Sequence, residues 1–349
     1  MGLQTYFEDF NKKIKTDYDE RSELADKRDI LLKKLRADKE LPSFEELNQG
    51  SYAMFTGVEP LDKDYDIDVG LRFKVNKDDY EPLELKEKVY DILKNHTEYG
   101  ADIRQPCVTV KYKKDGELAY HIDLVVYAYE DKDDTNSQLY LARGKKYSSE
   151  DNKYWEEADP KKLTDTIMDK YADSGDRDQY RRIIRYMKRW KNLKFSSDGN
   201  AEPPGIGITL LAYEKFYTAK TYDFLEDKYI YNDLDALLNF VKQVKNTFNL
   251  KEYSSDRSEW LYKIEVNLPV KPGTNVFSKM TDIQVTEFKK KIDSLVDDLE
   301  EVKKESDIVE QCTKLNKIFG DDFTIPAKEK ESKSQKNFVP PSSASGKGI

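Results

Sequence analysis

The segment 65–75 constrains the fold more than any other part of the chain, because its apolar and polar residues alternate. Every second position of 67–73 is apolar, and Asp66 and Asp68 lie on the opposite side of the alternation. A period of two is the pattern of a β-strand with one buried face. The sequence therefore predicts a sheet that packs one face on a core and carries two carboxylates on the other.

A third carboxylate, that of Asp123, lies in the middle of an apolar strand. Segments 108–112 and 121–129 are predicted to form a hairpin, and a charged residue inside such a strand is costly unless it is paired or binds a metal. Two carboxylates on one strand and a third on its neighbour supply the hard oxygen ligands that Mg²⁺ or Mn²⁺ prefers. We predict that Asp66, Asp68 and Asp123 are metal ligands and catalytic residues. The alternative for the first two is a solvated acidic strand face.

Gly50 and Ser51 precede this strand and are typical of a turn. Glycine lets the backbone approach a ligand closely, and the serine hydroxyl can donate to a phosphate oxygen. We predict that both residues contact nucleotide phosphates. His121, two residues before Asp123, is expected on the same strand face, and we favour a supporting hydrogen-bonded role for it over that of a general base.

The chain begins with an amphipathic pattern and becomes mainly helical in its second half. The pattern over 6–35 predicts one long helix, and helices are predicted over 160–171, 179–191, 206–217, 233–248 and 281–304. We predict an α+β fold of two lobes: a mixed-sheet lobe with the N-terminal helix over 1–160 and a helical lobe over 161–326. A mobile tail over 327–349, rich in Lys, Ser, Pro and Gly, is expected to follow.

The composition argues against a bulk nucleic-acid binder, a membrane protein and a disulfide-rich secreted protein. Lys and Arg number 59 against 68 for Asp and Glu, a net charge of −9, which disfavours a bulk binder of nucleic acid. The sequence has no apolar stretch of the roughly 20 residues that cross a membrane, and no secretory signal is recognisable. Two cysteines are too few for a disulfide framework. We therefore expect a cytoplasmic protein without membrane contact.

These motifs together resemble the DNA polymerase beta-like nucleotidyltransferase superfamily and, within it, the bacterial cGAS/DncV-like nucleotidyltransferases. The resemblance covers roughly 1–326. Beside the N-terminal helix, the segments that carry it are Gln-Gly-Ser-Tyr at 49–52, Tyr-Asp-Ile-Asp-Val-Gly at 65–70, His-Ile-Asp-Leu-Val-Val-Tyr at 121–127, Ala-Arg-Gly at 142–144, Arg-Tyr-Met-Lys-Arg-Trp-Lys at 185–191, Asn-Val-Phe-Ser-Lys-Met-Thr at 275–281 and Phe-Gly-Asp-Asp-Phe-Thr-Ile-Pro at 319–326.

The resemblance implies a polymerase beta-like fold with a nucleotide cleft between the two lobes. It implies that Ser51 contacts the triphosphate, that the three aspartates bind magnesium and that Lys188 reaches the phosphates. Arg185 lies on the same helix face as Lys188 and is a further candidate for nucleotide binding. Related enzymes carry a serine near the start of the next helix, where this chain has none, so Thr209 or backbone amides would take that place.

The implied activity is a cyclic oligonucleotide synthase that condenses two or three NTPs, releases pyrophosphate and activates an antiphage (CBASS) effector. The alternative is a sister enzyme that adds nucleotides to an RNA end or to a protein. The zinc-bearing insertion and basic face of the DNA-sensing relative have no counterpart here, so no DNA activator is expected. An operon-encoded regulator that conjugates the C-terminal tail is a further hypothesis, against the alternative of an ordinary disordered terminus.

Overall fold

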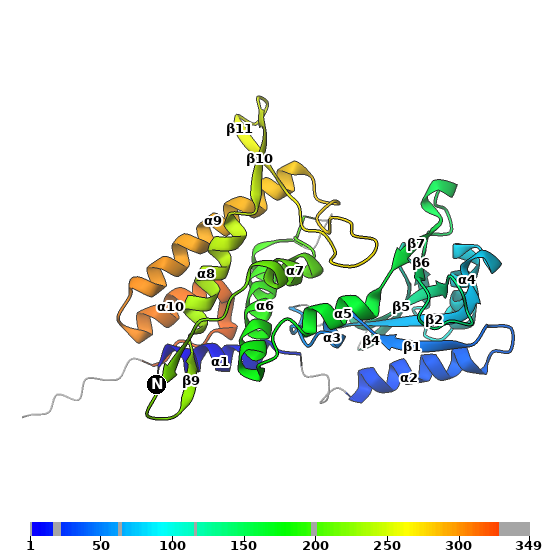
Figure 1. The fold of residues 1–349 in the computed structure, drawn as a ribbon, viewed down its shortest axis with the longest axis horizontal. Coiled ribbons are helices and arrows are strands. Elements are labelled where there is room, and N and C mark those ends of the chain that lie inside the picture. Colours follow the sequence, from blue (N-terminus) through cyan, green and yellow to red (C-terminus); the bar gives the residue numbers. More distant parts are fainter. Residues whose placement is uncertain (1, 17–21, 62–64, 115–116, 197–200, 328–349) are drawn as a thin grey trace, which may run out of the picture.

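The computed structural model describes residues 2–16, 22–61, 65–114, 117–196 and 201–327 and shows two lobes, one built on a sheet and one made mainly of helices (Figure 1). Of the predicted tail over 327–349, all but its first residue lies outside the described residues. Among the residues that are described, no helix is both long and apolar enough to cross a membrane.

The sheet lobe is built on a mixed sheet of seven strands. Its central order is β1-β2-β5-β4-β3, and β6 pairs with both β5 and β7. Strands β2 and β5 run parallel, whereas the other pairs are antiparallel, so the predicted mixed sheet is confirmed. The strands are β1 (Phe44–Asn48), β2 (Tyr65–Asn76), β3 (Ala101–Ile103), β4 (Val108–Lys114), β5 (Glu117–Tyr129), β6 (Leu139–Arg143) and β7 (Tyr154–Ala158).

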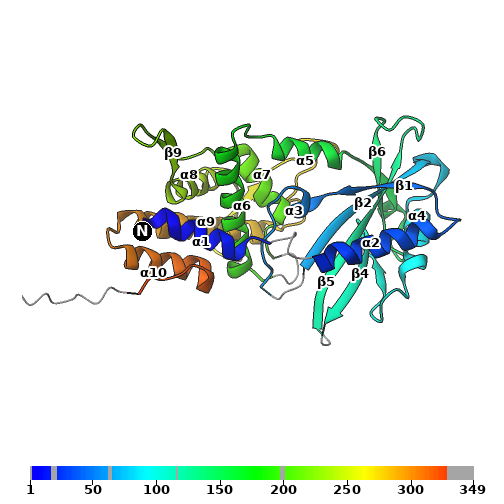
Figure 2. The ribbon, with the colours of Figure 1, turned by 90° about the horizontal axis from the view of Figure 1, so that it is seen from below.

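Two helices, α2 (Ser22–Ala37) and α4 (Pro82–Leu93), cover one face of this sheet. Figure 2 shows α2 lying across the strands. The buried side chains of β2, among them Ile67 and Val69, pack in one core with those of the two helices. Because side chains alternate along a strand, Asp66 and Asp68 point away from this core, toward the helical lobe. The predicted division of β2 into an apolar and an acidic face is therefore confirmed.

The helical lobe has a core of its own, to which seven helices contribute. They are α1 (Leu3–Ile14), α5 (Pro160–Met168), α6 (Ser174–Lys194), α7 (Gly205–Lys215), α8 (Asp233–Lys245), α9 (Asp282–Lys304) and α10 (Ile308–Phe319). Two hairpins extend from it, β8 (Lys220–Asp223) with β9 (Lys228–Tyr231) and β10 (Phe248–Ser254) with β11 (Glu259–Ile264). Short 3₁₀ helices lie at Lys77–Asp79, Glu150–Asn152 and Gly320–Asp322.

The single helix predicted over 6–35 is wrong, because the structure has two helices there, α1 and α2. Lys15, which follows α1, is extended and forms an isolated bridge with Val58. The buried residues of α1, such as Phe7 and Phe10, belong to the helical core, whereas those of α2 belong to the sheet core. The amphipathic period predicts a helix in each half, but the two halves pack on different cores.

The predicted helices of the second half are all present as α5 to α9, with ends that differ by several residues. Helix α10 and the two hairpins were not predicted. The division of the chain near residue 160 stays a prediction: α5 begins there, but α1, which we assigned to the sheet lobe, packs with the helices.

Candidate active site

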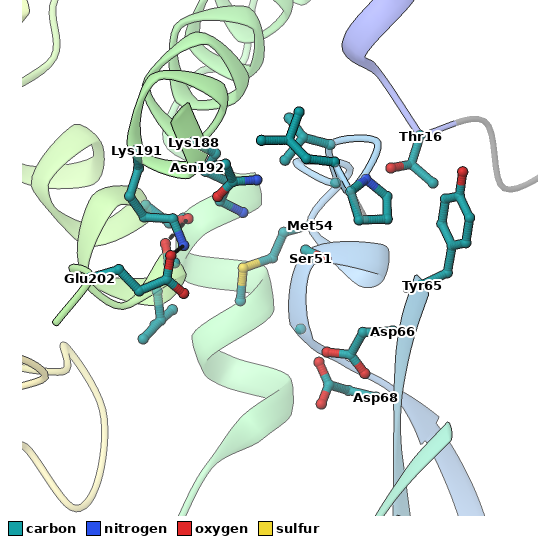
Figure 3. A pocket seen from close by; sticks show the side chains of 18 of the residues that line it. Thr16, Ser51, Met54, Tyr65, Asp66, Asp68, Lys188, Lys191, Asn192 and Glu202 are labelled. Atoms are coloured by element: carbon teal, nitrogen blue, oxygen red, sulfur yellow. Dashed lines mark hydrogen bonds and ion pairs between the residues drawn. The ribbon is translucent and has the colours of Figure 1, made fainter. Parts of the chain in front are cut away.

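A cavity of about 720 Å³ lies between the two lobes and contains most of the residues that the sequence singled out (Figure 3). From the sheet side Gly50, Ser51, Asp66 and Asp68 line it, and from the helical side Lys188 and Thr209. Figure 3 shows the carboxylates of Asp66 and Asp68 pointing into the space that faces α6. The arrangement therefore places Asp66 and Asp68 on one wall and Lys188 on the other.

The register of the central strands brings the acidic residues together. Asp66 lies opposite His121, and Asp68 opposite Asp123, in the parallel pair of β2 and β5. His121 Nε2 is 3.4 Å from Asp66 Oδ1 and 3.9 Å from Asp123 Oδ2. One potential ligand atom from each of these three residues lies within 4.8 Å of the others, a spacing that suits a shared metal ion. Asp68 is beside this group but is not part of it.

The charges of the same cluster change the pKa of the Asp68 carboxyl. Burial, followed by the charges of Asp66 and Asp123, raises the pKa of the Asp68 carboxyl to about 8. Such crowding of carboxylates is unfavourable by itself, and a divalent cation relieves it because the cation favours the ionised form of each ligand. The residues present at this wall therefore fit a hard divalent metal ion such as Mg²⁺ or Mn²⁺.

A threonine that the sequence analysis did not single out orients Asp123. Thr109 of β4 lies opposite Asp123 in the antiparallel pair, and its Oγ1 donates a hydrogen bond of 2.5 Å to Asp123 Oδ1. Thr109 is fully buried. This hydrogen bond fixes Oδ1 of Asp123, while Oδ2 of the same carboxylate faces His121. The predicted hairpin over 108–129 could have indicated this contact, because pairing of its two strands brings Thr109 near Asp123.

Position 50 requires glycine for two reasons, its backbone conformation and the lack of room for a Cβ atom. Its φ is +67°, in the region that favours glycine, and an added Cβ would lie 2.0 Å from Asp68 Oδ2. Gly50 begins the short helix α3 (Gly50–Ala53), which carries Ser51. The turn is tied to the sheet, because Gln49 N donates to Asp68 O at 3.3 Å and Tyr127 Oη donates to Gln49 Oε1 at 3.0 Å.

Lys188 faces the carboxylates from α6. Its Nζ donates to Thr56 O at 3.1 Å and to Thr56 Oγ1 at 3.0 Å, just beyond α3. Burial lowers the pKa of this ammonium to about 7, and the charges of Lys191 and Arg185 act in the same direction. Thr209 also lines the cavity, although its hydroxyl donates to Gly205 O at 3.1 Å within α7.

Arg185 shares the helix face of Lys188, as predicted, but the structure does not bring it to the cavity wall. Its Nε donates to Asn11 Oδ1 and its Nη1 to Phe55 O, both at 2.7 Å. Burial lowers the pKa of this guanidinium to about 10. Arg185 thus joins α1 to the segment that follows α3, and its predicted contact with nucleotide stays a prediction.

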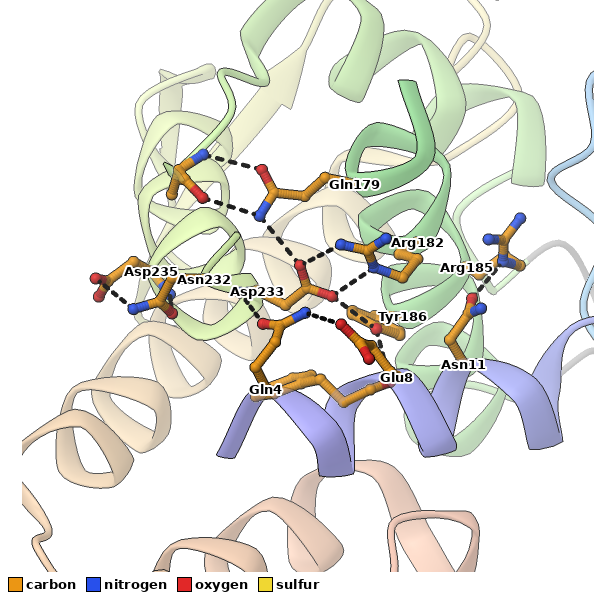
Figure 4. A network of polar contacts seen from close by, with 12 residues as sticks. Gln4, Glu8, Asn11, Gln179, Arg182, Arg185, Tyr186, Asn232, Asp233 and Asp235 are labelled. Carbon is orange, nitrogen blue, oxygen red and sulfur yellow. Dashed lines mark hydrogen bonds and ion pairs between the residues drawn. The ribbon is translucent and has the colours of Figure 1, made fainter. Parts of the chain in front are cut away.

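A buried polar network fixes α1 against the helical lobe (Figure 4). Asp233, fully buried at the start of α8, accepts two hydrogen bonds from Arg182, at 2.7 and 2.8 Å. Tyr186 and Gln179 donate to the same carboxylate. Gln4 Oε1 on α1 accepts from the backbone N–H of Asp233 at 2.8 Å. The network therefore positions the helix that leads into Thr16 at the cavity wall.

Two further charged residues line the cavity: Lys191, which the sequence analysis noted only within the segment 185–191, and Glu202, which it did not single out. They form an ion pair of 3.0 Å between Nζ and Oε2. The signal for Lys191 was present, since it lies three residues after Lys188 and therefore one turn along the same helix. Glu202 had no local signal, because it lies in the connection before α7.

Comparison with known proteins matches the sheet lobe to one family. Residues 44–127 match the model of the nucleotidyltransferase domain of the DncV-like cyclic GMP-AMP synthases. A cyclic GMP-AMP synthase of Escherichia albertii is 28% identical over 172 residues, which are 47% of this chain and 35% of that protein. The chain thus matches about a third of the length of this curated relative.

Solved structures share the fold over most of the chain. The CD-NTase CdnG of Bradyrhizobium diazoefficiens, determined with GTP, has a TM-score of 0.67 at 12% identity and covers 93% of this chain and 97% of its own. CdnC of E. coli MS115-1, with ATP, has a TM-score of 0.63 at 16% identity, with 93% and 99% covered. Vibrio cholerae DncV has a TM-score of 0.56 at 17% identity, with 82% and 72% covered. These likenesses show the polymerase beta-like fold.

Proposed function

We propose that the chain is a CD-NTase that condenses two or three NTPs into a cyclic oligonucleotide with release of pyrophosphate. The match of 44–127 to a DncV-like nucleotidyltransferase domain and the shared fold support this proposal. The observation that carries this proposal is the cavity between the lobes, where Asp66 and Asp68 face Lys188. Transfer from a triphosphate needs cationic groups that bind the phosphates and carboxylates that can hold metal ions at the reacting phosphate. This cavity supplies Lys188 for the first task and Asp66 and Asp68 for the second.

Asp66, Asp68 and Asp123 would hold the magnesium or manganese ions, with His121 beside them. When bound, two such ions polarise the α-phosphate and lower the pKa of the attacking hydroxyl. Asp68 lies next to the cluster of Asp66, His121 and Asp123, and rotation of its side chain away from Gly50 would complete the ligand set.

The remaining groups bind and orient the nucleotide. Ser51 and the backbone at Gly50 contact the phosphates from one side and Lys188 from the other, with Thr209 at the start of α7. The acceptor hydroxyl loses its proton to Asp123, whose carboxylate Thr109 holds in place. A bond forms between the acceptor oxygen and the α-phosphorus while the bond to the β-phosphate oxygen breaks, and pyrophosphate leaves.

Incubation with labelled NTPs and Mg²⁺, and with no other substrate, tests the proposal. We expect pyrophosphate and a small product that resists phosphatase, because a ring has no terminal phosphate. The double variant Asp66→Asn with Asp68→Asn keeps the shape of both side chains and should lose turnover by several orders of magnitude.

A phosphatase-sensitive product, or labelling only after RNA or protein is added, would instead support the sister activity that extends an RNA end or modifies a protein. Unchanged product formation in the double variant would refute the metal-dependent mechanism. The double variant Asp133→Asn with Asp134→Asn serves as the matched control, because these two residues lie in the exposed loop between β5 and β6.

The wider role is also a proposal. The cyclic product would activate a separate effector in an antiphage system, and the tail over 327–349 would be the target of an operon-encoded regulator. The net charge of −9 supports synthesis without a DNA activator. Product formation that is unchanged by added double-stranded DNA is the expected result.

A further inference from the structure

Lys191 and Glu202 form an ion pair inside the nucleotide cavity rather than on the surface. Lys191 Nζ lies 3.0 Å from Glu202 Oε2, and their side chains are 10% and 30% exposed. Both residues line the cavity that Ser51, Asp68 and Lys188 also line. Figure 3 shows the pair on the α6 side of the cavity, across from the carboxylates of β2. The pair therefore lies in the space that a bound NTP would enter.

Lys188 and Lys191 place two buried cations one helical turn apart on the same wall. Both lysines are buried as whole residues. Their charges interact, since the charge of Lys191 is among the causes that lower the pKa of Lys188. Two cations held together in a poorly solvated place cost free energy unless an anion is bound between them. The only described carboxylate within ion-pair distance of Lys191 is that of Glu202.

Glu202 is a poor permanent partner for a lysine that faces a triphosphate. Its carboxylate lines the same cavity, so it would repel the phosphate chain if it kept its place. A partly exposed ion pair contributes little, whereas a phosphate that accepts a charge-assisted hydrogen bond from an ammonium is a stronger partner. Because Glu202 is 30% exposed, its side chain can turn toward solvent when a phosphate replaces it.

We propose that Lys191 is a second cationic contact for the phosphate chain of the NTP, and that Glu202 occupies this contact while the cavity holds no nucleotide. The ligand is the triphosphate itself, so the contact is independent of the base. This inference rests on the proposed function only in taking an NTP as the ligand. The exchange of Glu202 for phosphate sets the affinity for nucleotide, because each binding event must break the ion pair.

Binding of non-hydrolysable ATP and GTP analogues with Mg²⁺, measured by calorimetry, tests this inference. Lys191→Met should weaken the binding of both triphosphates about tenfold. Glu202→Gln should strengthen it about three- to tenfold, since the competing charge is gone. A gain of affinity cannot arise from misfolding, so the second variant keeps the test valid even if the first one unfolds. Neither substitution should change the binding of AMP, which lacks the phosphate chain.

The matched controls are Lys161→Met and Asp165→Asn, which break an exposed ion pair on α5 outside the cavity. They should leave the triphosphate affinity unchanged. The inference is overturned if Glu202→Gln binds the triphosphates no more tightly than the unaltered protein, or if Lys191→Met weakens AMP and triphosphates equally. If the unaltered protein binds NTP as expected but makes no cyclic product, the proposed function fails while this inference stands.

Discussion

Replacing Asp68 with asparagine should change how the stability of the metal-free protein depends on pH. Burial and the charges of Asp66 and Asp123 raise the pKa of Asp68 from 3.8 to about 8. Between these two values the folded protein keeps a proton on Asp68 that the unfolded chain releases. Unfolding therefore releases a proton, and the stability that Asp68 contributes falls as the pH rises through this window.

The size of the effect follows from the proton balance. A difference of one bound proton changes the free energy of unfolding by about 1.4 kcal/mol per pH unit. From pH 5 to pH 7 this amounts to at most about 2.7 kcal/mol, and solvent in the cavity reduces it, so we expect about 1 to 3 kcal/mol. Asparagine has no proton to release, so Asp68→Asn loses this dependence and becomes more stable relative to the unaltered protein as the pH rises.

Urea denaturation in EDTA at pH 5, 6 and 7 measures this difference. The free energy of unfolding of Asp68→Asn minus that of the unaltered protein should increase by about 1 to 3 kcal/mol from pH 5 to pH 7. Added Mg²⁺ at pH 7 should stabilise the unaltered protein more than the variant, because the metal relieves the same repulsion. Asp165→Asn, at an exposed site on α5, is the control. Parallel pH dependence in Asp68→Asn and the unaltered protein would refute the reasoning.

Three further substitutions test single contacts. Gly50→Ala should lower the free energy of unfolding by about 1 to 2 kcal/mol and slow product formation, because alanine is strained at a φ of +67° and its Cβ would push apart Asp68 and the turn that carries Ser51; a variant as stable and as active as the unaltered protein would contradict the geometry. Thr109→Val should slow product formation about tenfold with unchanged NTP affinity, since Asp123 loses its orienting hydrogen bond; calorimetry and product assays separate the two effects. Asp233→Ala should lower the free energy of unfolding by about 3 kcal/mol in urea titrations, because it leaves Arg182 buried and unpaired; a loss below about 1 kcal/mol would show that the network does not anchor α1.

The acidic wall of the cavity could be predicted because its residues are set by local periodicity. Alternation in β2 fixed the face of Asp66 and Asp68, and the apolar surroundings of Asp123 indicated a strand with a costly charge. The parallel pairing of β2 with β5, which places Asp68 opposite Asp123, is a tertiary feature that no local pattern contains. The family resemblance supplied that step.

The helical wall was predicted less completely, because its function depends on packing between distant segments. Lys188 was found through the resemblance, but its partner Thr56 lies 132 positions away. Arg185 has the same chemistry and the same helix face, yet it meets Asn11 and Phe55. Nothing in the local sequence distinguishes these two cations. Likewise, the segment 6–35 contains no proline or glycine that would predict the end of α1. The helix ends because α1 packs on the core of the helical lobe and α2 on the core of the sheet lobe.

Anomalous diffraction from crystals grown with Mn²⁺ and a non-hydrolysable NTP analogue tests the central claim most directly. The account predicts manganese peaks about 2.1 Å from carboxylate oxygens of Asp66, Asp68 and Asp123, with the phosphates between Ser51 and Lys188. Peaks at other residues, or manganese bound by Asp66, His121 and Asp123 while Asp68 still points at Gly50, would contradict it.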